Sequence, residues 1–185
     1  SMQASEDWIL IHDDIVDGAL TRRSEPALHK RSDASMELAL NAGDALHMIQ
    51  WKILINSENT DPEVLKKLFN QMSDFLLVTC EGQFLELLWT KDNLFVGIDD
   101  YYKMVDRKTG SYTVGGPMKL GAISAGASDK ILKDIDELAV PLGRAFQIHD
   151  DWLDIYSEYL DKDRYGDLIE GKRTLLIHRA HELAD

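Results

Sequence analysis

One seven-residue pattern occurs twice in this chain and restricts the possible folds more than any other feature. Residues 11–17 read Ile-His-Asp-Asp-Ile-Val-Asp and residues 148–154 read Ile-His-Asp-Asp-Trp-Leu-Asp, so five of the seven positions are identical. On an α-helix the first and third Asp of each copy lie four residues apart on one face. The second Asp lies roughly 100° further round and can still reach a ligand held over that face. Because like charges at this spacing destabilise a helix by a few tenths of a kcal/mol per pair, the pattern favours a helix that binds a cation.

The two copies therefore predict a pair of divalent-cation sites. The candidate ligands are Asp13, Asp14, Asp17, Asp150, Asp151 and Asp154. Apolar residues precede both copies, which argues against the alternative of two fully solvated acidic faces. Carboxylate-only ligands favour hard cations, and Mg²⁺ characteristically binds one or two carboxylates together with water and substrate phosphates. His12 and His149 point off the carboxylate face, so we expect them to pack or to support the ligands.

Basic residues near the first copy favour a phosphate-bearing ligand. The adjacent Arg22 and Arg23 suit oxyanion binding beside a metal, although solvated charges at a turn are the alternative. Lys108 and Lys172 could equally be ordinary surface residues on these grounds. The sequence contains no P-loop and no nucleophile–base pair in a motif context. The chemistry that remains is metal-assisted loss of a diphosphate leaving group.

Composition narrows the partners and the compartment. The chain has 185 residues, 44% of them hydrophobic, and its 33 acidic against 20 basic residues give a formal charge of −13. We therefore expect neither nucleic acid nor an anionic membrane surface as a partner. No apolar run is long enough for a transmembrane segment. The single cysteine, Cys80, fits a reducing, cytoplasmic location, and its apolar neighbours predict a buried structural thiol.

The hydrophobic periodicity predicts one all-α domain over residues 1–185, with five to seven helices. Expected helix starts are Ser5 as a cap, Ser35, residues 59–63 with Pro62 in the first turn, Ile98, Ser128–Asp129 and the residues after Thr174. Expected breaks are a polar hinge at 21–26, an interruption near 115–117, a kink at Pro141 and a polar loop at 162–166. We assign the aromatic residues Trp89, Tyr101, Tyr102, Tyr112 and Trp152 to the core.

Further motifs make the chain resemble a known family. In order, they are Arg22-Arg23, Gly43-Asp44 within Asn-Ala-Gly-Asp-Ala-Leu-His, Glu81-Gly82-Gln83, Lys108-Thr109-Gly110, Phe146-Gln147 before the second Asp motif, and Asp167-x-x-Glu170-Gly171-Lys172-Arg173-Thr174. With the two Asp motifs they resemble the trans-isoprenyl diphosphate (polyprenyl) synthases over nearly the whole chain. The resemblance implies an all-helical bundle of the isoprenoid-synthase type around a central apolar cavity, whose mouth the two Asp motifs close.

The same resemblance implies roles for particular residues. Mg²⁺ would be held principally by Asp13, Asp17 and Asp150, with the other three motif carboxylates completing or supporting them. Isopentenyl diphosphate and an allylic prenyl diphosphate would be the substrates of a condensation. Arg22, Lys108 and Lys172 would bind the allylic diphosphate, Arg23 the isopentenyl diphosphate, and Thr109 and Gln147 would stabilise the allylic cation. The family also implies a homodimer, formed through helices such as the one after Ser35.

Two features concern the product and the extent of the chain. Trp8 and Ile9 lie just upstream of the first motif, where bulk limits product length in the family, so we expect C15 or C20 products. Compared with the family pattern, the sequence lacks the N-terminal helices that carry a Gly-Lys and a further Arg, and it ends soon after Thr174. We therefore expect an incomplete isopentenyl diphosphate site.

Three other readings remain open on sequence grounds. A terpene cyclase would share the fold and the first motif but usually has a different second metal motif. A metal-dependent phosphohydrolase is suggested by His12-Asp13 and His149-Asp150, although it would need several further His ligands at suitable spacing. A non-catalytic subunit that modulates a prenyl synthase is the third, although such subunits commonly lose motif Asp residues.

Overall fold

The computed structural model describes residues 1–58, 60–156 and 165–184, and these residues are predominantly helical, which confirms the all-α prediction. The chain divides into two compact units. Unit 1 comprises residues 1–60 and 157–166, and unit 2 comprises residues 61–156 and 167–185. The predicted polar loop at 162–166 falls largely outside the described residues. Among the described residues, no helix has both the length and the apolar character needed to cross a membrane.

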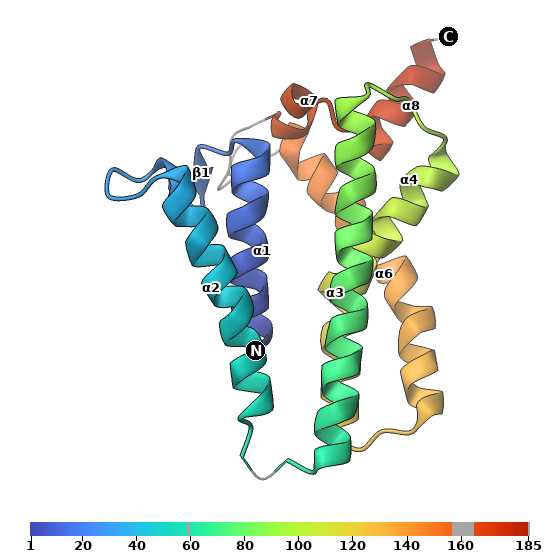
Figure 1. The fold of residues 1–185 in the computed structure, drawn as a ribbon. Coiled ribbons are helices and arrows are strands. Elements are labelled where there is room, and N and C mark those ends of the chain that lie inside the picture. The colour runs from blue at the N-terminus through green and yellow to red at the C-terminus, as the bar shows by residue number, and fades with distance from the viewer. Residues whose placement is uncertain (59, 157–164, 185) are drawn as a thin grey trace. The chain divides into compact units, whose positions relative to one another are not determined.

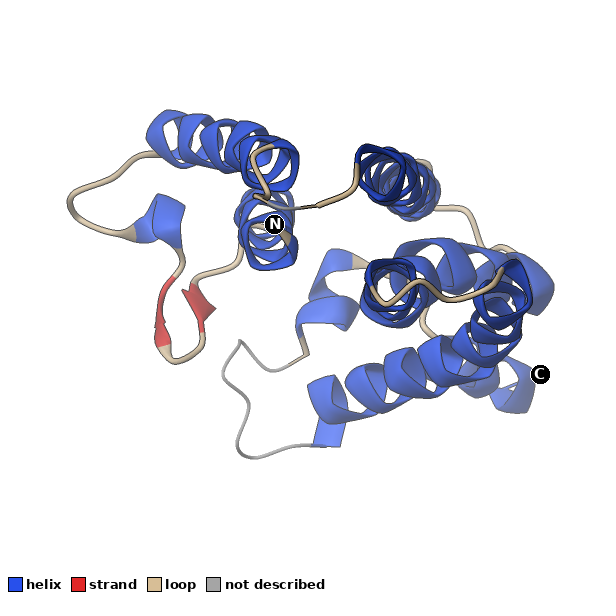
Figure 2. Ribbon diagram, turned by 90° about the horizontal axis from the view of Figure 1, so that it is seen from below, coloured by secondary structure: helices blue, strands red, loops and turns tan. Residues whose placement is uncertain are grey.

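Unit 1 is a pair of antiparallel helices, α1 (Met2–Asp17) and α2 (Met36–Ile55), which pack side by side (Figure 1). They are joined by a short hairpin of β1 (Thr21–Arg22) and β2 (Glu25–Pro26), red in Figure 2, and by the 3-10 helix η1 (Leu28–Lys30). The residues between the strands, Arg23 and Ser24, have φ of 54° and 64°. Two left-handed residues in succession make a turn whose twist matches paired strands, so the expected hinge is a hairpin.

The helix starts test the predicted capping residues. Ser5 is not a cap, because α1 begins at Met2 and Ser5 is fully buried within the helix. Ser35 does cap α2, since its hydroxyl accepts the Leu38 N–H at 3.4 Å. Asp61 caps α3 (Pro62–Lys91), and its carboxylate accepts the Glu63 N–H at 2.8 Å. Local side-chain chemistry therefore predicts two of these starts correctly.

Unit 2 is built around α3 and a second long helical run. That run consists of α4 (Ile98–Val105), the π-helix η2 (Asp106–Gly115) and α5 (Gly116–Ser124), which follow one another without a break. The helix α6 (Asp129–Tyr156) carries the second Asp motif and continues past Pro141. The short α7 (Gly166–Glu170), whose first residue falls in unit 1, and α8 (Leu175–Ala184) complete the described chain.

The predicted interruption at 115–117 is wrong because its glycines serve close packing. Gly115 and Gly116 keep right-handed helical dihedral angles, with φ of −62° and −58°. A Cβ added at Gly116 would lie 2.8 Å from the Phe75 ring of α3, and one at Gly115 would lie 3.3 Å from the Ala139 Cβ of α6. Pro117 is the second residue of α5, just after the change from π-helix to α-helix.

Two further glycines bring the neighbouring helices against the backbone of η2. A Cβ at Gly82 of α3 would lie 2.5 Å from the Lys108 nitrogen, and a Cβ at Gly143 of α6 would lie 2.3 Å from the Gly110 Cα. No larger side chain fits at either position without moving backbone. The close approaches therefore determine where Lys108 and its neighbour Thr109 lie relative to α3 and α6.

A small core lies where α4 meets the end of α3 and the start of α8. Tyr101, Met104 and Val105 are at most 5% exposed, and Leu85, Trp89 and Leu175 are among the side chains packed against them. The assignment of aromatic residues to the core is wrong for Trp152, which is 47% exposed. The expectation for Cys80 is also wrong, because its side chain is exposed on α3.

Candidate active site

In unit 1, the hairpin holds Arg22 against the first Asp motif. The Arg22 Nε donates to Asp14 Oδ1 at 2.9 Å, its terminal nitrogen also contacts that oxygen, and Asp14 is 4% exposed. Burial alone would lower the pKa of Arg22, but its hydrogen bond to Asp14 and the charges of Asp14, Asp13 and Asp17 outweigh burial and raise it. Asp14 is thus buried and paired with Arg22, whereas Asp13 and Asp17 are partly exposed.

The residues just before that motif pack on α2. The Trp8 indole N–H donates to Gln50 Oε1 at 3.0 Å, and its ring lies 4.7 Å from the His47 ring. The His12 ring lies over Gly43, where an added Cβ would come within 2.4 Å of Nε2. These contacts give His12 a packing role, as expected, while Ile9 is partly exposed.

In unit 2, the second Asp of the other motif is also buried and paired. Asp151 is 3% exposed, and its two oxygens accept the Tyr101 hydroxyl at 2.9 Å and the Gln147 amide at 2.8 Å. The Gln147 carbonyl in turn accepts the Thr109 hydroxyl. Burial raises the pKa of Asp151 to about 6, although the hydrogen bonds from Gln147 and Tyr101 oppose this shift. The structure thus brings Thr109, Gln147 and Asp151 together.

The other two carboxylates of the second motif differ in their exposure. Asp154 is 1% exposed and accepts the Asp167 backbone N–H at 3.3 Å, which attaches the start of α7 to α6. Asp150 is partly exposed. In both motifs, therefore, the second Asp is buried while the first Asp is partly exposed.

Each cation assigned to phosphate binding contacts a carboxylate. Lys108 pairs with Glu86 of α3, and both side chains are mostly buried. Lys172 lies 2.6 Å from Glu170 and 3.5 Å from Asp167. Arg23 makes an exposed pair with Glu6 at 3.0 Å. A diphosphate would compete with these carboxylates for the cations, because its phosphate oxygens accept the same charge-assisted hydrogen bonds.

The candidate oxygen ligands suit Mg²⁺ better than they suit a metal whose ligands all come from protein side chains. Across the described residues, no three His, Cys, Asp or Glu side chains converge as a metal site. Asp13, Asp17 and Asp150 are partly exposed oxygen donors. Mg²⁺ is typically bound by one or two carboxylates, with water and substrate phosphates supplying the remaining ligands. Asp13 and Asp17 in unit 1, and Asp150 in unit 2, are each donors of the type that Mg²⁺ uses together with a diphosphate.

Two residues of this network were not identified from the sequence. Tyr101 was assigned to the core, yet its hydroxyl contacts Asp151. The need of a buried tyrosine for a hydrogen-bond partner was the available signal. Glu86, the partner of Lys108, lies within α3 and carries no motif that distinguishes it from other helical glutamates.

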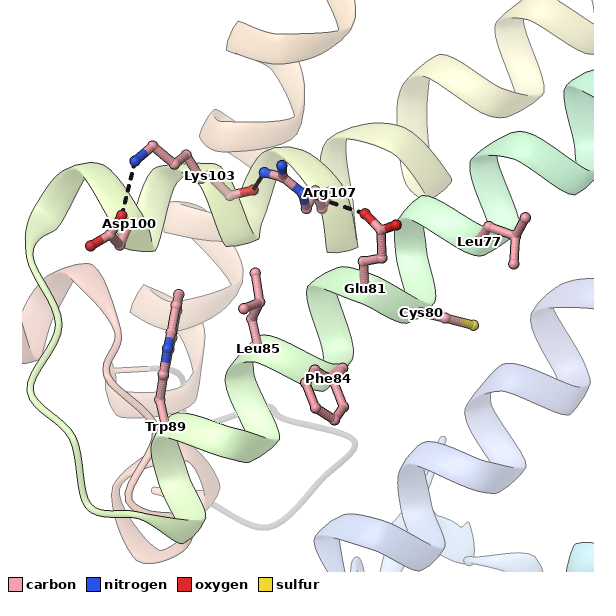
Figure 3. A pocket seen from close by; sticks show the side chains of 9 residues that line it. All are labelled: Leu77, Cys80, Glu81, Phe84, Leu85, Trp89, Asp100, Lys103 and Arg107. Atoms are coloured by element: carbon pink, nitrogen blue, oxygen red, sulfur yellow. Dashed lines mark hydrogen bonds and ion pairs between the residues drawn. The ribbon is translucent and has the colours of Figure 1, made fainter.

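A separate pocket of about 710 Å³ lies on unit 2, between α3 and the run of α4 and η2 (Figure 3). Its apolar lining includes Leu77, Phe84 and Trp89. At its edge, Arg107 pairs with Glu81 at 3.7 Å, and Lys103 pairs with Asp100 at 2.9 Å. Among its lining residues, Glu81 belongs to the Glu81-Gly82-Gln83 motif, and none is one of the site residues assigned from the sequence.

Comparison with known proteins gives consistent matches along the chain. The polyprenyl synthetase family model matches residues 5–185. A short chain isoprenyl diphosphate synthase of Methanothermobacter thermautotrophicus is 37% identical over 177 residues, which is 95% of this chain and 53% of that protein. A geranylgeranyl diphosphate synthase of Methanosarcina mazei is 36% identical over 185 residues, which is 98% of this chain and 55% of that protein. This chain thus spans about half the length of these relatives.

A solved structure agrees with these sequence matches. The geranylgeranyl pyrophosphate synthase of Corynebacterium glutamicum, complexed with isoprenyl diphosphate and magnesium, superposes with a TM-score of 0.91 at 26% identity. The match covers 100% of this chain and 56% of that one. The comparisons give no support to the phosphohydrolase or regulatory-subunit alternatives.

Proposed function

Because this chain belongs to the polyprenyl synthetase family, we propose that it acts as a prenyltransferase. It condenses isopentenyl diphosphate with an allylic prenyl diphosphate and releases a longer trans-polyprenyl diphosphate and pyrophosphate. The observation that carries the proposal is the pair of intact Asp motifs, each with a partly exposed first Asp and a buried, hydrogen-bonded second Asp. This arrangement suits a catalytic chain better than a subunit that only modulates a partner.

We assign the metal-binding role to the partly exposed carboxylates Asp13, Asp17 and Asp150. Asp14, Asp151 and Asp154 are more than 95% buried, so their role is to support the ligands and to orient neighbouring groups. When bound, Mg²⁺ would neutralise the negative charge that develops on the departing pyrophosphate. These three are also the principal ligands that the family resemblance implies, and their partial exposure supports the assignment.

The cationic side chains bind the diphosphates. Arg22, Lys108 and Lys172 hold the allylic diphosphate, and Arg23 holds the isopentenyl diphosphate. Charge-assisted hydrogen bonds from these groups strengthen as negative charge accumulates on the leaving group, so they stabilise the transition state more than the ground state.

Thr109 and Gln147 act on the hydrocarbon part of the allylic substrate. Loss of pyrophosphate leaves an allylic cation, and the oxygen dipoles of these two hydrogen-bonded side chains lower its energy. The double bond of isopentenyl diphosphate attacks the cation and forms the new carbon–carbon bond. A proton then leaves the adduct, with pyrophosphate as the acceptor, which restores a double bond. An apolar surround excludes water that would otherwise trap the cation.

We favour C15 or C20 products and a homodimer in the cytoplasm. Trp8 supplies bulk five residues before Asp13, where a growing chain would end.

For the dimer, α2 has exposed apolar side chains, including Leu38, Met48 and Ile53 at 61%, 57% and 49% exposure. Replacing Met48 and Ile53 with glutamate should convert the dimer to a monomer in sedimentation velocity. Unchanged sedimentation would contradict the use of this face.

A turnover assay tests the proposed reaction. Radiolabelled isopentenyl diphosphate is incubated with each allylic diphosphate in turn, in Mg²⁺ and in EDTA, and extractable product is measured. We expect elongated product in Mg²⁺ alone, and a loss of at least about 100-fold in kcat for Asp13→Asn and Asp150→Asn. Asp7→Asn on α1 and Asp136→Asn on α6 are matched controls outside the motifs and should retain activity. Metal-independent product, or equal losses in all four variants, would refute the proposal.

A further inference from the structure

Tyr101 joins three elements of unit 2 at the second Asp motif. Its side chain comes from α4, is 2% exposed and donates its hydroxyl proton to Asp151 Oδ2 on α6 at 2.9 Å. Leu175, the first residue of α8, packs against the core cluster that Tyr101 forms with Met104 and Val105. The phenol therefore bonds the second Asp motif directly and packs against the start of α8.

The direction of these hydrogen bonds determines what Asp151 can do. A phenol has one proton, and the Tyr101 hydroxyl directs it to Asp151 Oδ2, because an ionised carboxylate can only accept. The other oxygen of Asp151 accepts the Gln147 amide at 2.8 Å. Both carboxylate oxygens are thus held by donors from different elements, which fixes the orientation of the carboxylate plane.

The phenol itself is held rigidly. Its ring lies 5.5 Å from the Tyr102 ring and 5.8 Å from the His178 ring of α8, and it packs with Met104 and Val105. The ring cannot turn away without displacing these neighbours. Its hydroxyl is therefore a fixed point against which α6 is aligned.

The residues next to these contacts are those that the proposed function uses. Asp150 directly precedes Asp151, so fixing Asp151 also fixes the rotation of α6 that presents Asp150. Lys172 lies three residues before Leu175 and belongs to the segment that leads into α8. Tyr101 is thus the side chain through which the metal motif and the segment of Lys172 are joined.

We propose that Tyr101 is a positioning residue of the second Asp motif, which holds Asp151 so that Asp150 is presented to a divalent cation and which ties the start of α8 to the same motif. The inference rests on the proposed function, because the positioning matters only if Asp150 binds metal. Tyr101 acts through Asp151 and touches neither metal nor substrate.

The test compares Tyr101→Phe with the matched variant Tyr102→Phe. Phenylalanine keeps the buried ring and removes only the hydroxyl, so circular dichroism and melting should show a folded chain in both variants. Mn²⁺ binding is measured by electron paramagnetic resonance of the free ion, with inorganic pyrophosphate present. We expect affinity about 10-fold weaker in Tyr101→Phe, the usual scale for removing a supporting hydrogen bond, and unchanged in Tyr102→Phe. In turnover, kcat should fall while the KM for isopentenyl diphosphate stays within about twofold.

A double-mutant cycle separates positioning from simple structural support. In an Asp151→Asn background, Tyr101→Phe should cause no further loss of Mn²⁺ affinity, because the residue through which it acts is already altered. Losses that multiply, or wild-type affinity and kcat in Tyr101→Phe, would overturn the inference while leaving the proposed function intact. A wild-type chain with neither Mn²⁺ binding nor product would instead refute the proposed function, and the positioning role with it.

Discussion

Replacing Gly143 with alanine should push α6 away from the π-helix η2, and so separate Gln147 from Thr109. The added Cβ would lie 2.3 Å from the Gly110 Cα and 2.9 Å from the Gly110 nitrogen. Ordinary van der Waals contact begins at 3.4 Å, so the two backbones must part by about 1.1 Å. Because both nearest atoms belong to the backbone, no side-chain rotation can relieve the contact.

The expected cost follows from this displacement. Overpacking of a close-packed interior costs about 1–3 kcal/mol. At roughly 2–4 °C per kcal/mol for a chain of this size, Tm should fall by about 2–12 °C. The same movement lengthens the Thr109–Gln147 hydrogen bond beyond its useful range, and a misplacement of about 1 Å can lower kcat by about 100-fold.

Gly121→Ala is the matched control for this substitution. Gly121 also lies in a helix, α5, but nothing lies within 4 Å of an added Cβ. Alanine there should raise stability by about 0.4–1 kcal/mol, because it restricts the unfolded chain. Thermal melts of both variants and turnover of Gly143→Ala provide the measurements. Equal Tm changes, or a Gly143→Ala variant at least as stable as wild type, would refute the close approach of α6 to η2.

Three further substitutions test other parts of the site. Burial raises the pKa of Asp151 from 3.8 to about 6, so the native state binds the proton more tightly than the unfolded state, and stability falls as pH rises between these values. Asp151→Asn should therefore raise Tm at pH 7.5 but have less effect below pH 4. A Tm difference that does not change with pH would contradict this. Arg22→Gln leaves the buried Asp14 without its guanidinium and should lower the free energy of unfolding in urea by about 1–3 kcal/mol. Arg23→Gln should change that free energy by no more than about 0.5 kcal/mol, because its pair is exposed. Equal losses in the two variants would count against a stabilising buried pair. Trp8→Ala should lengthen the product if its bulk limits chain growth, and chromatography of the dephosphorylated products showing an unchanged length would rule that out.

The start of α3 illustrates what can be predicted from local sequence. Asp61 and Pro62 act within one turn of the helix they begin, so the cap and the first-turn proline are recognisable without knowing the rest of the fold. Ser5 shows the limit of the same rule. A serine before an acidic pair is typical of a cap, but α1 begins three residues earlier and buries Ser5, because packing against the rest of unit 1 outweighs capping preference.

The Asp motifs likewise combine features that can be predicted from the sequence with features that cannot. Their carboxylates, their spacing on a helix and the preference of such ligands for Mg²⁺ follow from residue type and periodicity alone. Residue type and periodicity do not show which carboxylate is accessible to a ligand. Asp14 is buried by Arg22 from the hairpin, and Asp151 is buried by Tyr101, which is 50 residues away in the chain. No local pattern encodes a contact over such a separation.

The sequence by itself thus determined the helical character of the chain, the chemistry of its two acidic motifs and the order of its other motifs, because these depend on residue type and on spacing within one or two turns. Only the tertiary structure decided that the helix runs on through Gly115 and Gly116, that Lys108 pairs with Glu86, and that Tyr101 holds Asp151. Each of these depends on how closely two backbones approach or on which side chain fills a buried position, and both are properties of packing between distant segments.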